Sequence, residues 1–285
     1  MSRRALSAPA AAALALAGLA LAAGCTPEQI AQGMVSTVKV AKAYRDFTWK
    51  EELEIGGTVA AKLAASYPVV EDGRATDYVN CLAATVSACG KRPDVLPRVL
   101  ILRDEIPNAY ACPGGYMFVT TGLLKTCRDE SELAGVLGHE FAHVAMKHTL
   151  ESLRKKRGSS AFLSEAAKNL EDQSNLAKLY PDFKGFVDSG IEAVADNRHG
   201  NEAEKEADVL GAEWAARAGY DGAGLGRFIE RLPGGAGGRW KEFSVYQDGA
   251  TREQRIAGNL KKLKLDGGGA TNPQRYAREL AAVTK

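Results

Sequence analysis

Histidine is scarce in this chain, and long apolar runs are missing from most of it. Only four of the 285 residues are histidine, and the formal net charge is +2. Because the charges nearly balance, composition gives no reason to expect a nucleic acid as a partner. Beyond residue 25 no hydrophobic run is long enough for a transmembrane helix. The 45% hydrophobic content is that of a globular protein with one large domain or two small ones.

The first 25 residues have the pattern of a bacterial export signal. Residues 1–4, MSRR, are basic, and an uncharged run rich in alanine and leucine follows as far as Cys25. That run is almost long enough to be a retained membrane anchor, but the small residues before Cys25 favour cleavage. LAAGC resembles a lipobox in which the leucine stands one position further from the cysteine than usual. We predict a lipoprotein signal peptide over residues 1–24 and a lipid anchor on Cys25.

The other cysteines lack the close C-x-x-C spacing of many zinc sites. They are Cys81, Cys89, Cys112 and Cys127. A tetracysteine zinc site is therefore the weaker interpretation. An even number of cysteines in an exported chain instead favours two disulfides, with three alternative pairings.

Hydrophobic periodicity predicts a helical protein with a small sheet. Residues 25–50 are expected to form a tether and lead-in helix, and residues 105–115 are rich in turn formers. We predict strands over 98–104 and 116–122 and helices over 51–67, 75–89, 129–156 and 201–219, with a last short helix near the end of the chain. Residues 158–200 are less regular. Helices on a small sheet indicate an α+β fold.

Three of the four histidines lie in HEFAHVAMKH, residues 139–148. His139 and His143 are four residues apart, so both rings project from one side of a helix. H-E-x-x-H is typical of zinc sites in which two histidines bind the metal and the glutamate, here Glu140, is the general base.

His148 falls elsewhere on a continuous helix. At roughly 100° per residue it lies on the apolar face, about 140° or more from both other histidines. We therefore predict a packed or hydrogen-bonded core histidine rather than a third ligand.

The third ligand is expected in the acidic run NEAEKEAD, residues 201–208. An acidic ligand and a second acid four residues later would lie on one side of a helix, where the second can hold a ligand histidine. Two pairs have that spacing, Glu202 with Glu206 and Glu204 with Asp208. An acidic solvated helix start is the alternative interpretation.

Helical phase separates the two pairs. The buried face is marked by Ala203, Ala207, Leu210 and Trp214. Glu204 lies about 60° from the centre of that face and Glu202 about 140°. Gly211 continues the Glu204 side and is small enough to let another helix approach. We predict Glu204 as the ligand and Asp208 as the supporting carboxylate.

Three stretches resemble the HtpX-type zinc metalloproteases, the family that includes the CAAX prenyl proteases. They are NAYACPGGYMFVTTGLL at 108–124, ELAGVLGHEFAHVAMKH at 132–148 and EAEKEADVLG at 202–211. With weaker matches, the resemblance spans roughly residues 51–260. The chain is most similar to the soluble, exported members BepA and LoiP.

The resemblance implies a fold and a domain order. The fold would be a mainly helical zincin of the gluzincin-like type, with a small sheet beside the H-E-x-x-H helix. A metallopeptidase domain is expected over 51–265 and a C-terminal tail over 266–285.

The resemblance also implies residue roles. His139, His143 and Glu204 would bind one Zn²⁺ per chain, with Glu140 as the base and Asp208 in support. Candidate donors to the oxyanion are Tyr246 and Arg255. A segment beside the active site would pair with a substrate strand; it comprises Gly114, Gly115, Tyr116, Met117 and Phe118.

Two places depart from the family pattern. Gly200 and Asn201 stand where Ser-Arg is usual, and Gly249 and Ala250 replace a late His-Pro. In some members that late histidine folds back as a fourth metal ligand. No histidine follows His199 in this chain, so we expect water in the fourth position.

The expected function is that of a zinc metalloendopeptidase of the bacterial cell envelope, degrading misfolded or misassembled envelope proteins. The expected partners are unfolded or misassembled polypeptides and the membrane, reached through lipidated Cys25, with no nucleic acid. We expect an outer-membrane location facing the periplasm. A non-catalytic, zinc-containing assembly factor or chaperone is the alternative, but degenerate enzymes usually lose the base, and Glu140 is present.

Overall fold

The structure is a computed structural model that describes residues 46–157, 188, 200–232 and 249–284. Its contacts divide the chain into two units, Met1–Asp46 with Arg154–Ser164, and Phe47–Leu153 with Glu165–Lys285. The second unit holds the sheet and the candidate site. The predicted anchor Cys25 and the predicted oxyanion donor Tyr246 lie outside the described residues.

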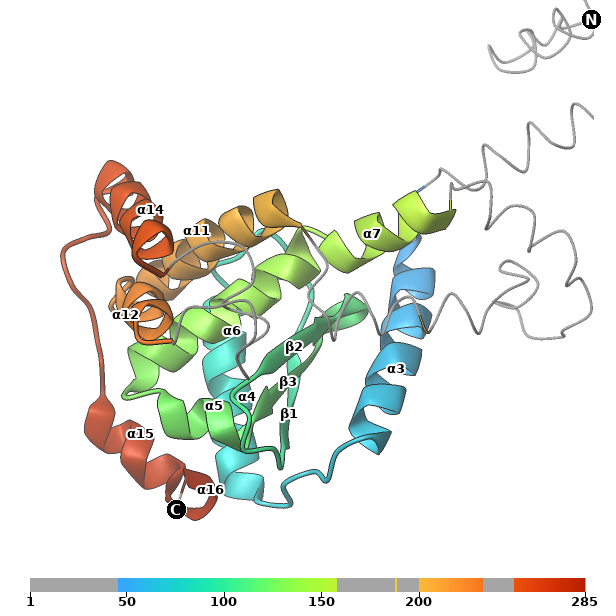
Figure 1. Ribbon diagram of the computed structural model, residues 1–285, viewed down its shortest axis with the longest axis horizontal. Helices are drawn as coiled ribbons and strands as arrows, with labels where there is room; N and C mark the ends of the chain where they lie inside the picture. Colours follow the sequence, from blue (N-terminus) through green and yellow to red (C-terminus); the bar gives the residue numbers. More distant parts are fainter. Residues whose placement is uncertain (1–45, 158–187, 189–199, 233–248, 285) are drawn as a thin grey trace, which may run out of the picture. The chain divides into compact units, whose positions relative to one another are not determined.

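Helices dominate the described part of the chain, as expected for a zincin-like fold (Figure 1). The predicted helices 51–67, 75–89 and 201–219 correspond to α3, α4 and α11. The helices are α3 (Trp49–Ala65), α4 (Gly73–Ser87), α5 (Thr121–Thr126), α6 (Glu130–Ala145), α7 (His148–Arg157), α11 (Asn201–Arg217), α12 (Gly224–Glu230), α14 (Gly249–Leu263), α15 (Pro273–Glu279) and α16 (Ala281–Thr284).

A three-stranded sheet has the order β1-β3-β2. β1 (Arg98–Leu102) runs parallel to β3 (Tyr116–Thr120), and β2 (Ala109–Cys112) runs antiparallel to it. The sequence prediction missed β2, whose four residues lie among turn formers. They become a strand because the 3₁₀ turn η1 (Pro113–Gly115) folds the chain back onto β3. The predicted strand 116–122 was too long, since α5 begins at Thr121.

The two faces of the sheet are covered by different helices. Val99, Ile101, Met117 and Val119 point to one face and belong to the same hydrophobic cluster as residues of α4 and α6. α3 packs on the other side, where Gly57 faces the Tyr116 ring. The sheet is thereby fixed beside α6.

α3 also holds the turn that leads into β3. Its first turn is closed by a capping box, in which Thr48 and Glu51 bond each other's backbone N–H. A Cβ on Gly56 would lie 1.8 Å from the Pro113 carbonyl oxygen, so only glycine allows this contact. Buried Glu52 accepts hydrogen bonds from the Gly114 N–H at 3.3 Å and from Arg92 at 2.8 Å.

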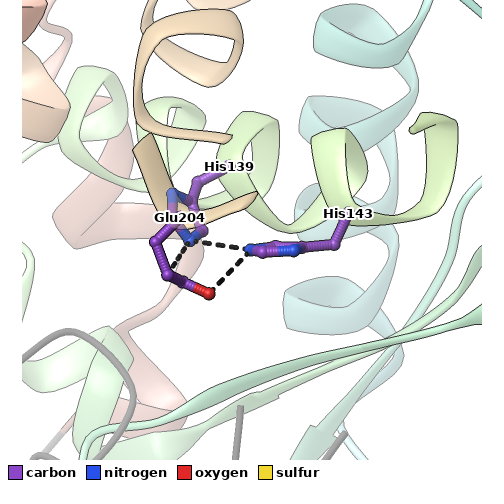
Figure 2. A group of neighbouring side chains, drawn as sticks. All are labelled: His139, His143 and Glu204. Carbon is purple, nitrogen blue, oxygen red and sulfur yellow. Dashed lines mark hydrogen bonds and ion pairs between the residues drawn. The ribbon is translucent and has the colours of Figure 1, made fainter. Parts of the chain in front are cut away.

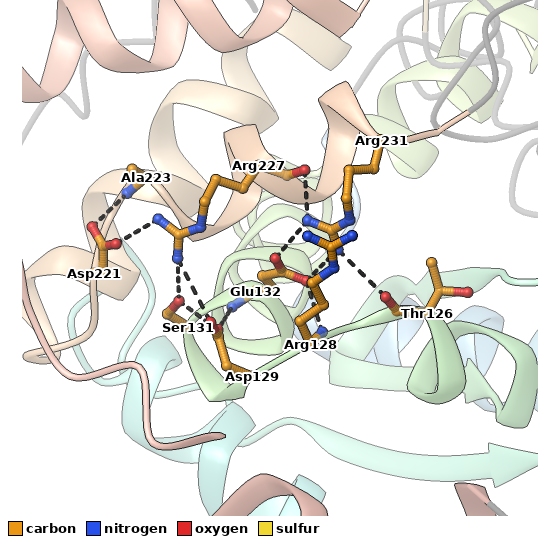
Figure 3. Close-up of polar contacts among 9 residues, drawn as sticks. All are labelled: Thr126, Arg128, Asp129, Ser131, Glu132, Asp221, Ala223, Arg227 and Arg231. Carbon is orange, nitrogen blue, oxygen red and sulfur yellow. Dashed lines mark hydrogen bonds and ion pairs between the residues drawn. The ribbon is translucent and has the colours of Figure 1, made fainter. Parts of the chain in front are cut away.

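α6 is the central helix, and every one of its residues is buried. It is surrounded by α4, α11, α12 and the sheet. Asp129 caps its first turn by accepting from the Glu132 N–H at 3.0 Å. Figure 3 shows how Arg227 of α12 and Arg231, which directly follows α12, reach this turn; Arg231 makes two 2.6 Å hydrogen bonds to Glu132. Such paired bonds fix α12 on the start of α6.

The predicted helix 129–156 is wrong in its middle, because it consists of two helices. α6 ends at Ala145 and α7 begins at His148. Lys147 between them has φ 59°, in the left-handed region that interrupts a helix. The angular position that we assigned to His148 on a continuous helix is therefore wrong.

The expected C-terminal tail is part of the second unit. Buried side chains of α15, of α16 and of the residue between them join the main hydrophobic cluster: Tyr276, Val283 and Leu280. The Tyr276 hydroxyl also donates to the Leu124 carbonyl oxygen at 2.5 Å. The predicted domain boundary at residue 265 would therefore run through a single hydrophobic core.

The expected disulfides are not formed, since all four described cysteines are free. Cys81 is on α4 and Cys89 lies just beyond its end. Eight helical residues rise about 12 Å, whereas a disulfide needs Cα atoms about 4.4–6.8 Å apart. Cys112 ends β2 and Cys127 follows α5, and burial raises the pKa of both thiols.

In the part of the chain that the structure describes, no helix combines the length and apolarity needed to cross a membrane.

Candidate metal centre

α6 and α11 cross at two glycines. A Cβ on Gly138 would lie 2.6 Å from the Gly211 carbonyl oxygen, and a Cβ on Gly211 would lie 2.4 Å from the backbone nitrogen of His139. With no side chains between them, the helices approach closely. The prediction that Gly211 lets another helix approach is confirmed. This contact carries Glu204 of α11 to the histidines of α6.

Three buried side chains converge at this crossing (Figure 2). The Nε2 atoms of His139 and His143 are 3.2 Å apart. One carboxylate oxygen of Glu204 is 3.4 Å from the first and the other is 3.5 Å from the second. One ligand atom from each residue lies within 4.8 Å of the others. The cluster can hold a metal ion.

The polar atoms of the cluster fit a cation. Neither carboxylate oxygen of Glu204 has a hydrogen-bond donor in the described part of the chain, and Glu204 is only 4% exposed. Burying a carboxylate without donors costs several kcal/mol, of the order found for buried unpaired charges. A cation bound by Glu204 and two imidazoles would offset that cost, and two nitrogens with one carboxylate are a donor set that zinc takes.

A carboxylate contacts His139 at Nδ1, the ring nitrogen that points away from the cluster. Its Nδ1 lies 3.1 Å from Oδ1 of Asp208, which is fully buried. Asp208 in turn accepts from Arg252 at 2.6 and 2.9 Å and from Arg255 at 3.3 Å. Although burial acts to raise the pKa of Asp208, its hydrogen bonds with His139 and Arg252 lower it to about 2. The carboxylate therefore stays ionised and fixes the His139 ring.

The charges around His139 favour a cation. Burial acts to lower the pKa of its imidazole, but the carboxylates of Asp208 and Glu204 outweigh burial and raise the pKa to about 10. Without a metal, the ring would therefore take up a proton at neutral pH. The same negative surroundings attract a metal ion, which would displace that proton.

Another histidine contacts His143 at Nδ1, the ring nitrogen that points away from the cluster. Its Nδ1 lies 2.9 Å from Nδ1 of His148, and Nε2 of His148 lies 3.3 Å from Oε2 of Glu206. The prediction of a hydrogen-bonded His148 is confirmed, although the ring faces His143 and not the opposite side of a helix. Burial lowers the pKa of His148.

Glu140 is 1% exposed, and its Oε1 has no hydrogen-bond partner among the described residues. Burial raises the pKa of this carboxyl to about 7; a charge on His139 opposes the rise and the charge of Glu204 adds to it. Such a pKa suits a group that exchanges protons near neutral pH.

The predicted substrate-strand segment does not have a free edge. Tyr116, Met117 and Phe118 lie on β3, whose backbone pairs with β1 on one side and β2 on the other. Gly114 and Gly115 form η1, with φ 77° and 89°. Strand addition along Tyr116–Phe118 is therefore wrong, because β1 and β2 occupy both edges of β3. β2, on the edge of this sheet, is the strand that contacts α6.

The structure also shows where Arg255 and Glu202 lie, and it adds contacts that sequence analysis did not predict. Arg255 contacts Asp208, and Glu202 is exposed and bonded to Lys205 at 2.6 Å. Sequence analysis missed Arg252, and it did not predict that His148 contacts His143 or that Glu206 contacts His148. Arg252 is three residues before Arg255, on the same side of α14, and that spacing was the available signal.

The chain is similar to known peptidases. Residues 74–274 match the model of peptidase family M48. A putative beta-barrel assembly-enhancing protease of Vibrio cholerae is 28% identical over 221 residues, which cover 75% of this chain and 44% of that protein. The beta-barrel assembly-enhancing protease of Escherichia coli is 28% identical over 189 residues, 64% of this chain and 37% of that protein.

A mitochondrial protein is also similar. The metalloendopeptidase OMA1 of Schizosaccharomyces pombe is 27% identical over 181 residues, 64% of this chain and 51% of that protein. The chain thus spans 37% to 51% of the length of these three relatives. Because the family model matches well over half of the chain and includes the whole cluster of His139, His143 and Glu204, the chain belongs to peptidase family M48.

Proposed function

We propose that this chain is a zinc metalloendopeptidase of the bacterial cell envelope that cleaves misfolded or misassembled proteins. The observation that carries the proposal is the convergence of His139, His143 and Glu204 with a buried Glu140 beside them. A metal site alone would suit a structural role. A buried acid with a pKa near 7 at the same site supports catalysis.

The residues of the candidate site would have separate roles in binding the metal and in orienting its ligands. His139, His143 and Glu204 would hold the ion, and three protein ligands leave one coordination position open. Zinc bound there supplies a Lewis acid that polarises a peptide carbonyl and lowers the pKa of water. Asp208 and His148 hold the two imidazoles with their Nε2 atoms toward the ion.

Glu140 would move the protons. As a carboxylate it takes a proton from the attacking water, and as a carboxylic acid it gives that proton to the leaving amine. Both forms are accessible near neutral pH because its pKa is about 7. A bound cation would favour the carboxylate, which is the form that begins the cycle.

The envelope location rests on two supports. Residues 1–25 have the pattern of a lipoprotein export signal. Two of the similar bacterial proteins are named as beta-barrel assembly-enhancing proteases. We therefore propose an outer-membrane lipoprotein that faces the periplasm through lipidated Cys25, with unfolded or misassembled envelope polypeptides as substrates.

Glu140→Gln tests the catalytic proposal. The variant should bind zinc with wild-type stoichiometry but cleave unfolded casein more slowly by roughly 10²–10⁴-fold, as for other positioned acids and bases. Glu202→Gln, on exposed residue Glu202 of α11, is the matched control and should cleave at the wild-type rate. Zinc content would be measured by elemental analysis. A Glu140→Gln variant with near wild-type activity would refute the mechanism, and a zinc-loaded but inactive wild type would favour a non-catalytic assembly factor.

A further inference from the structure

The break between α6 and α7 gives His148 a contact that helical spacing does not predict. In a continuous helix, residues five apart point about 140° away from each other. Here Lys147, with φ 59°, turns the chain, and the rings of His143 and His148 have centroids 4.9 Å apart at 71°. The side chain of His148 is thereby brought against the back of a candidate metal ligand.

The contact joins the ring nitrogens that point away from the cluster. Nε2 of His143 lies in the cluster, 3.2 Å from Nε2 of His139, while its Nδ1 lies 2.9 Å from Nδ1 of His148. Two facing ring nitrogens can bond only if one carries a proton and the other accepts it. A metal on Nε2 of His143 leaves the proton on Nδ1, so Nδ1 of His148 is the acceptor.

The same logic extends to α11. If Nδ1 of His148 accepts, the neutral ring carries its proton on Nε2. That atom lies 3.3 Å from Oε2 of Glu206, which can accept the bond. Glu206 is 41% exposed at its side chain, whereas Asp208 and Glu204 are buried. His148 thus links His143 to a carboxylate whose charge remains partly solvated.

We propose that His148 is a positioning residue for His143, which fixes the ring with its proton on Nδ1 and its Nε2 toward the metal, and that Glu206 orients His148. The inference rests on the proposed metal site. It gives each ligand histidine its own support from α11: Asp208 contacts His139 directly, at 3.1 Å, and Glu206 reaches His143 through His148. A directly bonded carboxylate at His143 would add another buried charge beside Glu204.

Two substitutions of His148 distinguish the effect of the hydrogen bond from the effect of side-chain packing. His148→Leu has a side chain of comparable size but lacks the acceptor nitrogen. His148→Asn places Oδ1 on the same carbon that carries Nδ1 in histidine, so the acceptor is retained. Zinc affinity, measured by competition with a chelator, should fall by roughly 10–100-fold in His148→Leu, as for other groups that support metal ligands. His148→Asn should recover most of this loss.

A substitution on α11 tests the outer bond. Glu206→Ala should weaken zinc binding by about 10-fold, the lower end of that range, and because its side chain is partly exposed, we expect the variant to fold. Glu202→Ala is the matched control, because Glu202 is exposed on the same helix and bonds Lys205. Thermal melting of each metal-free variant would identify loss of folding, and Glu206→Ala decides the question if His148→Leu does not fold.

A readout without metal distinguishes this inference from the proposed function. Nitrogen-15 NMR of the metal-free protein should show His143 as one tautomer with the proton on Nδ1, and a mixture of tautomers in His148→Leu. Wild-type protein that binds no zinc would refute the proposed function, while the ring signals would still test the hydrogen bond. A His148→Leu variant with zinc affinity within about twofold of wild type, or a His148→Asn variant no better than it, would overturn the positioning role.

Discussion

At the scale of single residues, burial distinguishes three acids that lie within about two turns of α11. Glu202 is exposed and bonds Lys205, whereas Glu204 is 4% exposed and Asp208 is 0% exposed. A buried carboxylate is stable only with a compensating charge or donors. Asp208 has two arginines, and Glu204 has two imidazoles and the place for a cation between them.

Glu204→Ala should therefore release the metal, while Glu202→Ala should not. Removing one of three protein ligands is expected to lower zinc content from about one per chain to a small fraction of that. Elemental analysis after dialysis measures the difference. Zinc lost from Glu202→Ala and kept by Glu204→Ala would show that the ligand assignment is wrong.

Zinc binding should release protons from His139. The pKa of this ring is about 10 in the metal-free site, where the carboxylates of Asp208 and Glu204 outweigh burial. Below that pH a proton competes with the metal, so apparent zinc affinity should rise as pH rises toward 10. Calorimetry in buffers with different ionisation enthalpies would count the released protons. An affinity that falls with rising pH between 6 and 8, about the range of a normal imidazole, would contradict this.

At the scale of elements, α6 is constrained on all sides, because each of its residues is buried. Its crossing with α11 depends on backbone contact at Gly138 and Gly211. Its first turn depends on charged groups from other elements. Arg231 bonds Glu132, and buried Glu130 accepts from Tyr78 and Asn272 and bonds Arg275. The candidate site therefore depends on helices that contribute no ligand.

Gly138→Ala should destabilise the protein through the α6–α11 contact. The new Cβ would lie 2.6 Å from the Gly211 carbonyl oxygen, and overpacking against backbone typically costs about 1–3 kcal/mol. Gly258→Ala is the matched control, because no atom lies within 4 Å of its added Cβ. In mid-helix that change should stabilise by roughly 0.5–1 kcal/mol. Urea unfolding of the metal-free proteins gives both values; equal effects would show that the glycine contact is not tight.

Glu130→Gln should lower the free energy of unfolding at neutral pH but much less at acidic pH. Burial acts to raise the pKa of Glu130, but hydrogen bonds from Arg275, Asn272 and Tyr78 lower it. The ionised Glu130 carboxylate therefore contributes to the free energy of unfolding in full above the pKa of the unfolded chain, about 4.3. It is lost as pH falls through the lower folded pKa. At neutral pH the variant should be about 1–3 kcal/mol less stable. The comparison is the free energy of unfolding of both proteins between pH 7 and pH 3, roughly the range that brackets this carboxyl, and parallel curves would exclude Glu130 as the source.

At the scale of the whole molecule, the C-terminal helices complete the core that holds α6. Tyr276 and Leu280 belong to the same hydrophobic cluster as Leu133 and Leu137 of α6. Thr271 accepts a backbone hydrogen bond from Glu130 at 2.9 Å. The unit that contains the site thus comprises Phe47–Leu153 and Glu165–Lys285, including the C-terminal helices.

Cys25→Ser should move the protein from the membrane fraction to the soluble fraction, because serine cannot carry a thioether-linked lipid. Ultracentrifugation of lysed cells measures the distribution. Cys81→Ser is the control, since Cys81 is an exposed free thiol on α4, and it should stay with the membranes. A Cys25→Ser variant that still sediments with membranes would point to an uncleaved N-terminal helix or to a tight partner.

Most of the predictions that the structure confirms came from the local spacing of residues along helices and strands. Helical spacing placed His139 and His143 on one side of a helix and separated Glu204 from Glu202, and the structure brings the first three together. These relations depend on residues a few positions apart, whose geometry a helix sets by itself. The small sheet and the main helices follow from the same kind of signal.

Tertiary structure alone decided the rest. β2 forms by pairing with β3, Arg252 acquires its role only when α14 reaches Asp208 of α11, and His148 meets His143 only because the chain turns at Lys147. All four described cysteines are unpaired in the fold. Each of these depends on contacts between distant segments or on one backbone angle, and neither leaves a periodic pattern in the sequence. The amino-acid sequence by itself determined the chemistry of the metal cluster, and packing decided which groups support it.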